Sequence, residues 1–245
     1  MIVVSKIIWL AKFSLLWMSY CLRHNRDSKI IYYHDLGRNY SDMGTEFDLF
    51  QRHLNIIEAM GFKLVDTISD EKNQIMVCFD DGLRGIYYHQ DYFIKKDFFP
   101  TIFLAVELIG ERNYLTKEEI IEMEKKGFHF QCHSWSHTGL PFHTEIELKH
   151  ELEDSKKYLE NVLGYEVDSI CFPQGLFSQT VIDKCKEYGY KKMYSSISGS
   201  YNHLKEKGLL CRHLLQDIPD PWVKYIIEGD SVLLRKHLAK LHYIK

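Results

Sequence analysis

Histidine and aspartate side chains occur at two points of this 245-residue chain in patterns that suit a metal site. His133 and His137 are four residues apart, a spacing that places both imidazoles on one side of a helical turn, where they can chelate one ion. Asp80 and Asp81 follow an apolar run, and adjacent carboxylates are costly to ionise together unless a cation is near. One Asp and two His would leave an open position for water, from which the other Asp could take a proton.

Each motif alone also has an ordinary structural explanation. The chain contains 13 histidines, so chance pairs are expected, and His133 and His137 could be surface or capping residues. Asp81-Gly82 could be part of a solvated turn, because Asp-Gly is common in turns. The two motifs support a shared site only if the fold brings them together.

Strand-like runs alternate with amphipathic stretches through most of the chain. Seven short runs are apolar or aromatic and predict strands. They cover residues 30–34, 75–79, 100–106, 128–133, 169–172, 192–195 and 209–214. Helices are expected near 46–60, 85–97, 116–126, 144–163, 178–189 and 219–241. Thr116 with Glu119, and Thr144 with Glu147, have the spacing of capping boxes. This alternation predicts an α/β protein, a single distorted (β/α)7 TIM-like barrel with an extra N-terminal amphipathic helix.

Polar residues cluster at the carboxyl ends of the predicted strands. In a β/α barrel these ends converge on one mouth, where active sites lie. The residues are His34, Asp80, Asp81, His133, His137, Pro173, Gln174 and His213. We therefore expect these residues, although distant in sequence, to face one pocket.

Composition places the chain among globular proteins, with 45% hydrophobic and 27% charged residues. The net charge is −3, but both ends are basic and the body is acidic, which suggests that the ends meet something anionic. An acidic body without a recognition motif argues against nucleic-acid binding. We expect an N-terminal basic segment over 1–29, a barrel over 30–228 and a C-terminal basic helix over 229–245.

Residues 1–22 are largely apolar, with polar residues recurring every seven positions as one narrow stripe. These are Ser5, Lys12 and Ser19. With Trp9 and Trp17, the pattern favours a helix lying in a membrane interface. The segment is too polar for a confident transmembrane helix and lacks an A-x-A cleavage site. A helix packed on the protein body, a signal anchor and a cleaved signal remain as alternatives.

The motifs together resemble those of the polysaccharide deacetylases of carbohydrate esterase family 4, over about residues 30–215. Residues 31–34, Ile-Tyr-Tyr-His, look like the first strand of that family. Residues 78–82, Cys-Phe-Asp-Asp-Gly, are similar to its T-F-D-D-G motif. Residues 133–137 match H-[ST]-x-x-H, and residues 169–175 resemble the third motif. The motifs occur in order, each at the position that the barrel interpretation requires.

The resemblance implies roles for individual residues. Asp80 would be the general base, and Asp81, His133 and His137 would bind one divalent ion, for which Zn²⁺ is expected. The backbone N–H of Gln174 would help to stabilise the oxyanion. The implied reaction removes an N-acetyl group from an amino sugar.

Three departures from the family pattern affect this assignment. Gln174 stands where the family usually has an aromatic residue. Cys171 falls near the usual position of an Arg that pairs with the base, a charge that Arg84 or Arg212 could supply. The late L-x-H motif, which carries the general acid, has no clear match, and His213 is the nearest candidate.

Further residues are expected around the substrate or outside the site. His34, Arg84, Pro173 and Arg212 are candidate substrate contacts. His242 lies in the terminal basic helix, a position that looks wrong for an active site.

We interpret the chain as a metal-dependent amide hydrolase acting on a polysaccharide or its lipid- or nucleotide-linked precursor, in surface-polysaccharide synthesis. The basic ends and the lack of a convincing signal peptide favour a cytoplasmic location at the inner membrane face, with peripheral contact through residues 1–22. A deformylase of a lipid-linked amino sugar and a non-catalytic sugar-binding relative are the alternatives.

Overall fold

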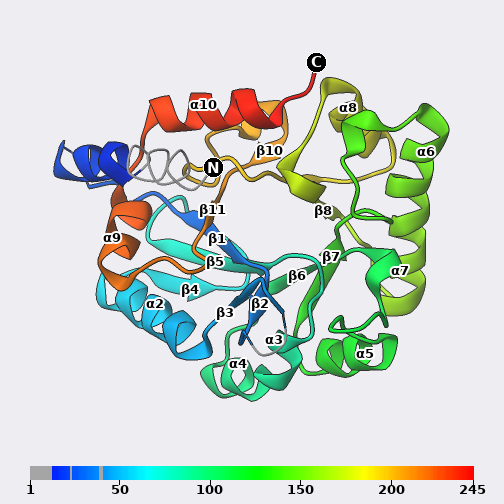
Figure 1. The fold of residues 1–245 in the computed structure, drawn as a ribbon, viewed down its shortest axis with the longest axis horizontal. Helices are drawn as coiled ribbons and strands as arrows, with labels where there is room; N and C mark the ends of the chain where they lie inside the picture. The colour runs from blue at the N-terminus through cyan, green and yellow to red at the C-terminus, as the bar shows by residue number, and fades with distance from the viewer. Residues whose placement is uncertain (1–12, 23, 39–40) are drawn as a thin grey trace.

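The computed structural model describes residues 13–22, 24–38 and 41–245 and shows a barrel-shaped parallel sheet surrounded by helices (Figure 1). The barrel strands are β1 (Lys29–Tyr33), β5 (Gln74–Phe79), β6 (Thr101–Leu104), β7 (His129–Cys132), β8 (Ser169–Cys171), β9 (Lys192–Tyr194), β10 (Leu209–Leu210) and β11 (Arg212–Leu214). All pairings between them are parallel. Three short strands lie off this path: β4 (Lys63–Val65) pairs with β5, and β2 (Asp35–Leu36) pairs with β3 (Gly44–Thr45).

One bent segment closes the barrel. The strands run in the order β10-β9-β8-β7-β6-β5-β1-β11, and only Cys211 separates β10 from β11 in sequence. Leu210 pairs with Tyr194 on one side of the barrel, and Arg212 pairs with Ile30 on the other. Residues 209–214 therefore act as the seventh strand, and the predicted seven-stranded TIM-like barrel is confirmed.

Helices surround the sheet (Figure 1). They are α2 (Phe47–Ala59), α3 (Gly85–Tyr88), α4 (Gln90–Lys96), α5 (Lys117–Lys125), α6 (Glu145–Lys149), α7 (Ser155–Leu163), α8 (Gln179–Glu187), α9 (Asp220–Glu228) and α10 (Val232–His242). A π-helical turn, η3 (His150–Asp154), joins α6 to α7. Short 3-10 turns are η1 (Val106–Leu108), η2 (Leu140–Phe142), η4 (Pro173–Gly175) and η5 (Lys205–Lys207). The capping boxes begin α5 and α6 as expected.

The single helix expected over 219–241 is wrong, because the chain turns between α9 and α10. Gly229 lies against another backbone, and an added Cβ there would be 2.7 Å from the carbonyl oxygen of Leu16. The Ser231 hydroxyl then accepts a hydrogen bond from the N–H of Leu234 and starts the new helix. The stretch 85–97 is also divided, at His89, into α3 and α4.

Alternating side chains divide the core between the inside and the outside of the barrel. Ile31 and Val77 belong to the large cluster that includes residues of the surrounding helices. Tyr32 and Cys78, which point to the opposite face, belong to a small second cluster that also contains Phe103. This small cluster therefore fills the barrel interior, below the carboxyl ends of the strands.

Residues 13–22 form a helix that packs on the barrel domain. Phe13 and Leu16 are each 1% exposed, and the Phe13 ring lies 4.6 Å from that of Trp222 in α9. The other side of this helix, with Trp17 and Met18, is exposed. Residues 1–12, most of the segment expected in a membrane interface, lie outside the described residues. Within the described ranges, no helix has the length and apolar character needed to cross a bilayer.

Candidate active site

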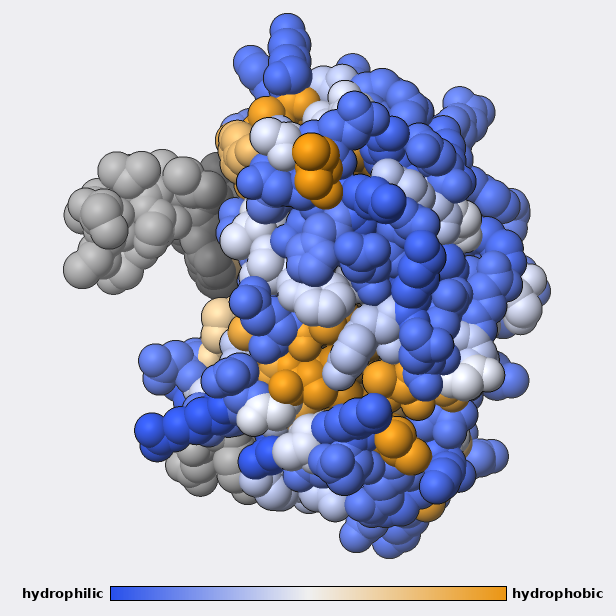
Figure 2. Space-filling view, turned by 90° about the vertical axis from the view of Figure 1, so that its right-hand side faces the viewer, coloured by the Kyte–Doolittle hydropathy of each residue, from blue (hydrophilic) through white to orange (hydrophobic). Residues whose placement is uncertain are grey.

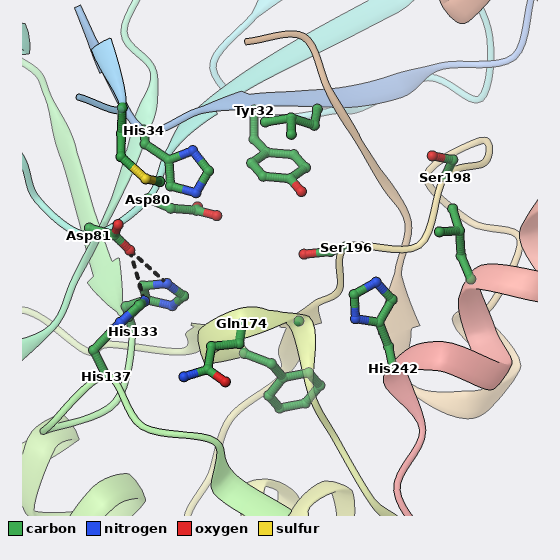
Figure 3. A pocket seen from close by; sticks show the side chains of 15 residues that line it. Tyr32, His34, Asp80, Asp81, His133, His137, Gln174, Ser196, Ser198 and His242 are labelled. Carbon is green, nitrogen blue, oxygen red and sulfur yellow. Dashed lines mark ion pairs between the residues drawn. The ribbon is translucent and has the colours of Figure 1, made fainter. Parts of the chain in front are cut away.

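A pocket of about 420 Å³ lies at the carboxyl ends of the barrel strands (Figure 3). Its lining brings together residues from β1, β11 and α10 and from the loops that follow β5, β7, β8 and β9. The polar residues among them are Tyr32, His34, Asp80, Asp81, His133, His137, Gln174, Ser196, Ser198 and His242. The predicted convergence of distant polar residues on one pocket is therefore seen for six of the residues named from the sequence: His34, Asp80, Asp81, His133, His137 and Gln174.

Asp81, His133 and His137 form a compact group that could hold a metal ion. Oδ1 of Asp81 lies 3.2 Å from Nε2 of His133 and 3.0 Å from Nε2 of His137. One ligand atom from each residue lies within 4.8 Å of the others. Figure 3 shows the three side chains pointing toward one another at the edge of the pocket.

The hydrogen bonding of His133 makes this group fit a cation. Its Nδ1 lies 2.7 Å from the carbonyl oxygen of Cys171, which can only accept, so Nδ1 carries the proton of the neutral ring. Nε2 then directs a lone pair at the buried Oδ1 of Asp81, whose neighbours at hydrogen-bond distance are the Nε2 atoms of the two histidines. Two acceptors facing each other are satisfied by a cation between them, and a carbonyl bond on the far nitrogen is typical of metal-binding histidines.

Left-handed backbone conformations set the directions of the Asp81 and His137 side chains. Asp81, Ser134 and His137 have φ values of 70°, 68° and 59°, which are uncommon for residues other than glycine. Conformations of this kind cost on the order of 1–3 kcal/mol each and concentrate at functional sites. The Ser134 hydroxyl accepts a hydrogen bond from the N–H of His137 and helps to hold the turn.

Asp80 is held by a two-point ion pair at the top of the barrel interior. Its oxygens lie 2.7 and 2.8 Å from Nη1 and Nη2 of Arg212, and both side chains are almost fully buried. The guanidinium also lies 4.2 Å from the ring centre of Tyr32. Burial alone would raise the pKa of Asp80, but the adjacent Arg212 outweighs it and lowers that pKa. Asp80 is therefore ionised at neutral pH.

A tight turn, η4, places Gln174 at the pocket. Gln174 has φ 58°, and Gly175 after it has φ 70°. An added Cβ on Gly175 would lie 2.8 Å from Nδ1 of His242, so this position requires glycine. The N–H of Phe177 donates to the carbonyl oxygen of His242, which ties η4 to the end of α10.

The family model of the polysaccharide deacetylases matches residues 67–193, just over half of the chain. This chain belongs to the polysaccharide deacetylase family. The match includes the possible metal-binding group, Asp80 and Gln174, and it confirms the family that the sequence motifs resemble.

Curated relatives match this family member over part of their length. YxkH of Bacillus subtilis (strain 168) carries the name of a polysaccharide deacetylase. It is 25% identical to this chain over 146 residues, which are 59% of this chain and 52% of YxkH. A 30.6 kDa protein of Geobacillus stearothermophilus is 26% identical over 130 residues, 52% of this chain and 48% of its own. The chain thus matches only about half the length of these relatives.

Solved structures share the barrel. The deacetylase PplD of Streptococcus pyogenes, in complex with acetate, superposes with a TM-score of 0.71 at 21% identity, over 83% of this chain and 99% of PplD. IcaB of Ammonifex degensii gives 0.72 at 18% identity, over 84% and 99% of the two chains. A polysaccharide deacetylase of Bacillus cereus gives 0.70 at 22% identity, over 82% and 69%. At these identities the likeness shows the fold.

Arg212 explains one departure from the family motifs. The sequence places Cys171 where an arginine is usual, and Nη2 of Arg212 lies 2.9 Å from Sγ of Cys171. A guanidinium from β11 thus occupies the space beside Asp80 that the small Cys171 side chain leaves open. Arg212, which was also a candidate substrate contact, is 1% exposed and contacts Asp80.

The other candidate residues lie around the pocket or outside it. Nδ1 of His34 donates to the side-chain oxygen of Gln216 at 2.7 Å, and His34 lines the pocket. His213 is 3% exposed, and its Nε2 accepts a hydrogen bond from the N–H of Gly199 at 3.1 Å. Arg84 forms an ion pair with Glu119 at 3.0 Å. Among the described residues, the pocket lining includes neither His213, Arg84 nor Pro173, and their roles stay predictions.

Sequence reasoning missed two contributors to the site. His242, rejected because it lies in a basic terminal helix, lines the pocket beside Leu238. Their spacing of four residues is the signal that could have been used, since it places both on one face of a helix. Glu151, in the π-helical turn, accepts hydrogen bonds at 3.0 Å from the N–H groups of Trp135 and Ser136. Glu151 is 4% exposed, and its two hydrogen bonds hold the turn between His133 and His137.

Proposed function

We propose that this protein is a metal-dependent N-deacetylase that hydrolyses the N-acetyl group of an amino sugar in a polysaccharide or its lipid- or nucleotide-linked precursor. The observation that carries the proposal is the joint presence of the Asp81–His133–His137 group and the ionised Asp80 in one pocket. The fold shared with PplD, a deacetylase in complex with acetate, supports an acetyl group as the one removed.

The three-ligand group accounts for the metal dependence. Two imidazoles and one carboxylate accept several divalent ions, and we propose Zn²⁺. A divalent cation held there would supply Lewis-acid polarisation of the amide carbonyl and lower the pKa of a water molecule. The residues of the chain perform the remaining steps.

Asp80 acts as the general base. Its carboxylate faces the same pocket as the metal group and is kept ionised by Arg212, so it can accept the proton of the attacking water. The two hydrogen bonds from Arg212 fix its orientation, which keeps it aimed at the reacting atoms. The backbone N–H of Gln174 donates to the developing oxyanion, a role that the unusual side chain at this position leaves intact.

His34 is the best placed proton donor for the leaving amine. It lines the pocket, is oriented by Gln216, and its charge influences the pKa of Asp80. His213, the candidate from the sequence, instead uses Nε2 as an acceptor for the N–H of Gly199. We therefore propose His34 as general acid and His213 as a residue that supports the pocket wall.

We further propose peripheral membrane contact through residues 1–22, at the inner face of the cytoplasmic membrane, in surface-polysaccharide synthesis. The described part of this segment presents exposed apolar side chains, with Trp17 49%, Met18 51% and Leu22 84% exposed. Exposed aromatic and apolar residues on a surface helix favour the interfacial region of a bilayer.

The first test combines metal content with product analysis. Wild type should bind about one zinc ion per chain, and His133→Ala should lose it because one ligand is gone. His129→Ala, at an exposed position four residues earlier, is the matched control and should keep the metal. Absence of bound zinc in the wild type after zinc incubation would rule out the mechanism.

Acetate release is then measured with N-acetylhexosamine oligomers, nucleotide-linked N-acetylhexosamines and lipid-linked amino sugars. Asp80→Asn should lower the rate by about 10²–10⁴-fold, since a general base is lost. Formate release from an N-formyl substrate in place of acetate would identify a deformylase instead. No release from any of these substrates by the zinc-loaded protein would favour a non-catalytic sugar-binding role.

A further inference from the structure

A second hollow, of about 790 Å³, lies between α8, α10 and the segment from Leu204 to Leu209. Its floor is apolar: Phe177, Ile182, Ile197 and Leu209 line it and are each 4% exposed or less. α10 and α8 both lie along the upper edge of the molecule in Figure 1, and the side of the molecule seen in Figure 2 is mainly hydrophilic with separate apolar patches. The volume falls in the range of about 300–1,000 Å³ that is typical of ligand pockets.

Four lysines surround this apolar floor. They are Lys186, Lys207, Lys240 and Lys245. All four are exposed, and none forms an ion pair with another residue in the described part of the chain. Glu206 is the one carboxylate side chain in the lining. The hollow therefore combines an apolar surface with an excess of positive charge, which suits an anion attached to an apolar chain.

The outer face of α10 has the same combination. Leu233, Lys236, Lys240 and Leu241 are exposed. The first three are three to four residues apart, which keeps them on one side of the helix, and Leu241 follows at the edge of that side. Leu233 and Leu241 are 68% and 56% exposed. Apolar side chains flanked by lysines on a surface helix are typical of helices that lie on anionic membranes.

We propose that this hollow binds an anionic phospholipid of a membrane surface, with the phosphate at the lysine rim and part of an acyl chain on the apolar floor. Lys240 belongs to both the rim and the outer face of α10. The protein can therefore hold one lipid in the hollow while the outer face of α10 lies on the membrane surface. This binding site does not depend on the proposed catalytic function.

The lipid site adjoins the catalytic pocket through a shared wall. Leu238 and His242 line the pocket, whereas their neighbours Ala239 and Tyr243 line the hollow. A parallel bridge between Phe177 and Tyr243 joins this wall to the η4 turn that carries Gln174. A phospholipid bound in the hollow would therefore hold the catalytic pocket close to the membrane surface.

Vesicle partition of the full chain tests the charge requirement. We expect binding to phosphatidylcholine vesicles that contain phosphatidylglycerol and little binding to phosphatidylcholine alone. Lys207→Glu with Lys240→Glu should weaken partition by about 30-fold or more, since each basic residue near an anionic surface contributes about fivefold. Lys95→Glu with Lys125→Glu changes the net charge equally at exposed lysines on α4 and α5, across the molecule from α10, and should have little effect (Figure 1).

Three vesicle outcomes would overturn the proposal: no preference for anionic vesicles, equal losses in both double variants, or no loss in the Lys207/Lys240 variant. The second would mean that overall charge decides binding, and the third that another surface, such as residues 1–22, does so.

A soluble probe tests the apolar floor. Dihexanoyl-phosphatidylglycerol below its micelle concentration should bind the wild type in calorimetry, and inorganic phosphate should bind much more weakly. Ala239→Trp, which fills the hollow from its wall, should reduce short-chain lipid binding by at least about tenfold while the melting temperature stays near that of the wild type. Equal affinity for phosphate and the short-chain lipid would identify a free-anion site and overturn the lipid assignment.

Discussion

The carboxylate of Asp80 is bonded through both oxygens to a single guanidinium in the interior of the barrel. A buried ion pair adds little net stability, but removing one partner leaves an uncompensated charge. Arg212 therefore matters to the site in two ways: it keeps Asp80 ionised, and it prevents the barrel interior from holding a lone carboxylate.

A double-variant series separates these effects. Arg212→Met should lower the free energy of unfolding by about 3–5 kcal/mol, because Asp80 is left buried without a partner. Adding Asp80→Asn should recover much of that loss but none of the activity, since the base is gone. Denaturant unfolding checks the prediction, and additive losses in the double variant would contradict it.

Asp35 provides a pH-dependent contribution to stability. It is 0% exposed, and burial raises its pKa from 3.8 to about 6. The folded state therefore binds this proton more tightly than the unfolded state, so the stabilisation is present below about pH 4 and is lost as pH rises through about 6.

Asp35→Asn removes this titration. The free energy of unfolding of the wild type relative to the variant should fall by up to about 3 kcal/mol between about pH 4 and pH 8. Melting curves of both proteins across this range are the measurement. A difference that does not vary with pH would show that Asp35 has an ordinary pKa.

Among the elements, the π-helical turn η3 (His150–Asp154) is hydrogen-bonded to the turn that carries His133 and His137. Such turns interrupt a helix and often occur at functional sites. Here the interruption carries Glu151, whose carboxylate also accepts from the Ser136 hydroxyl at 2.6 Å. The helix thereby holds the turn from His133 to His137 by three hydrogen bonds on one side chain.

Glu151→Gln should weaken zinc affinity by about 10–100-fold, because an amide cannot accept all three bonds and the ligand turn loosens. Glu153→Gln, in the same turn and paired with Lys157, is the control and should leave zinc affinity unchanged. A competitive metal titration measures both, and circular dichroism checks that the fold persists. Equal zinc affinity in the wild type and Glu151→Gln would assign Glu151 a role in folding alone.

At the scale of the whole molecule, the helix over residues 13–22 is part of the folded unit. Phe13 and Leu16 are buried against the barrel domain, and Ser19 accepts a hydrogen bond from the N–H of Asp230 between α9 and α10. This helix therefore secures the connection that leads into α10, the element that lines the catalytic pocket.

Truncating Phe13 tests that connection. Phe13→Ala should lower the free energy of unfolding by about 3–5 kcal/mol, as expected for a buried aromatic side chain. Trp17→Ala, at a half-exposed position on the same helix, should change it by much less. Denaturant unfolding of both variants is the measurement, and similar small losses would mean that the helix is not packed in solution.

The sequence by itself determined the features that depend on neighbouring residues. Apolar runs separated by amphipathic stretches predicted the seven strands and the barrel, and Thr116 with Glu119 marked a capped helix start. The pairing of His133 with His137 was also visible, because the two residues are close in the chain. The helical turn expected for them is wrong, since the segment is irregular and Ser134 and His137 are left-handed. These features follow from local periodicity and capping, for which the sequence records both partners side by side.

Only the tertiary structure decided which distant side chains meet. Arg212 reaches Asp80 because residues 209–214 close the barrel, and Arg84, an equal candidate by sequence, pairs with Glu119 instead. His242 reaches the pocket because Gly229 packs against the helix over 13–22 and the chain turns there. Such contacts depend on strand closure and close backbone approach, and no spacing along the chain encodes either one.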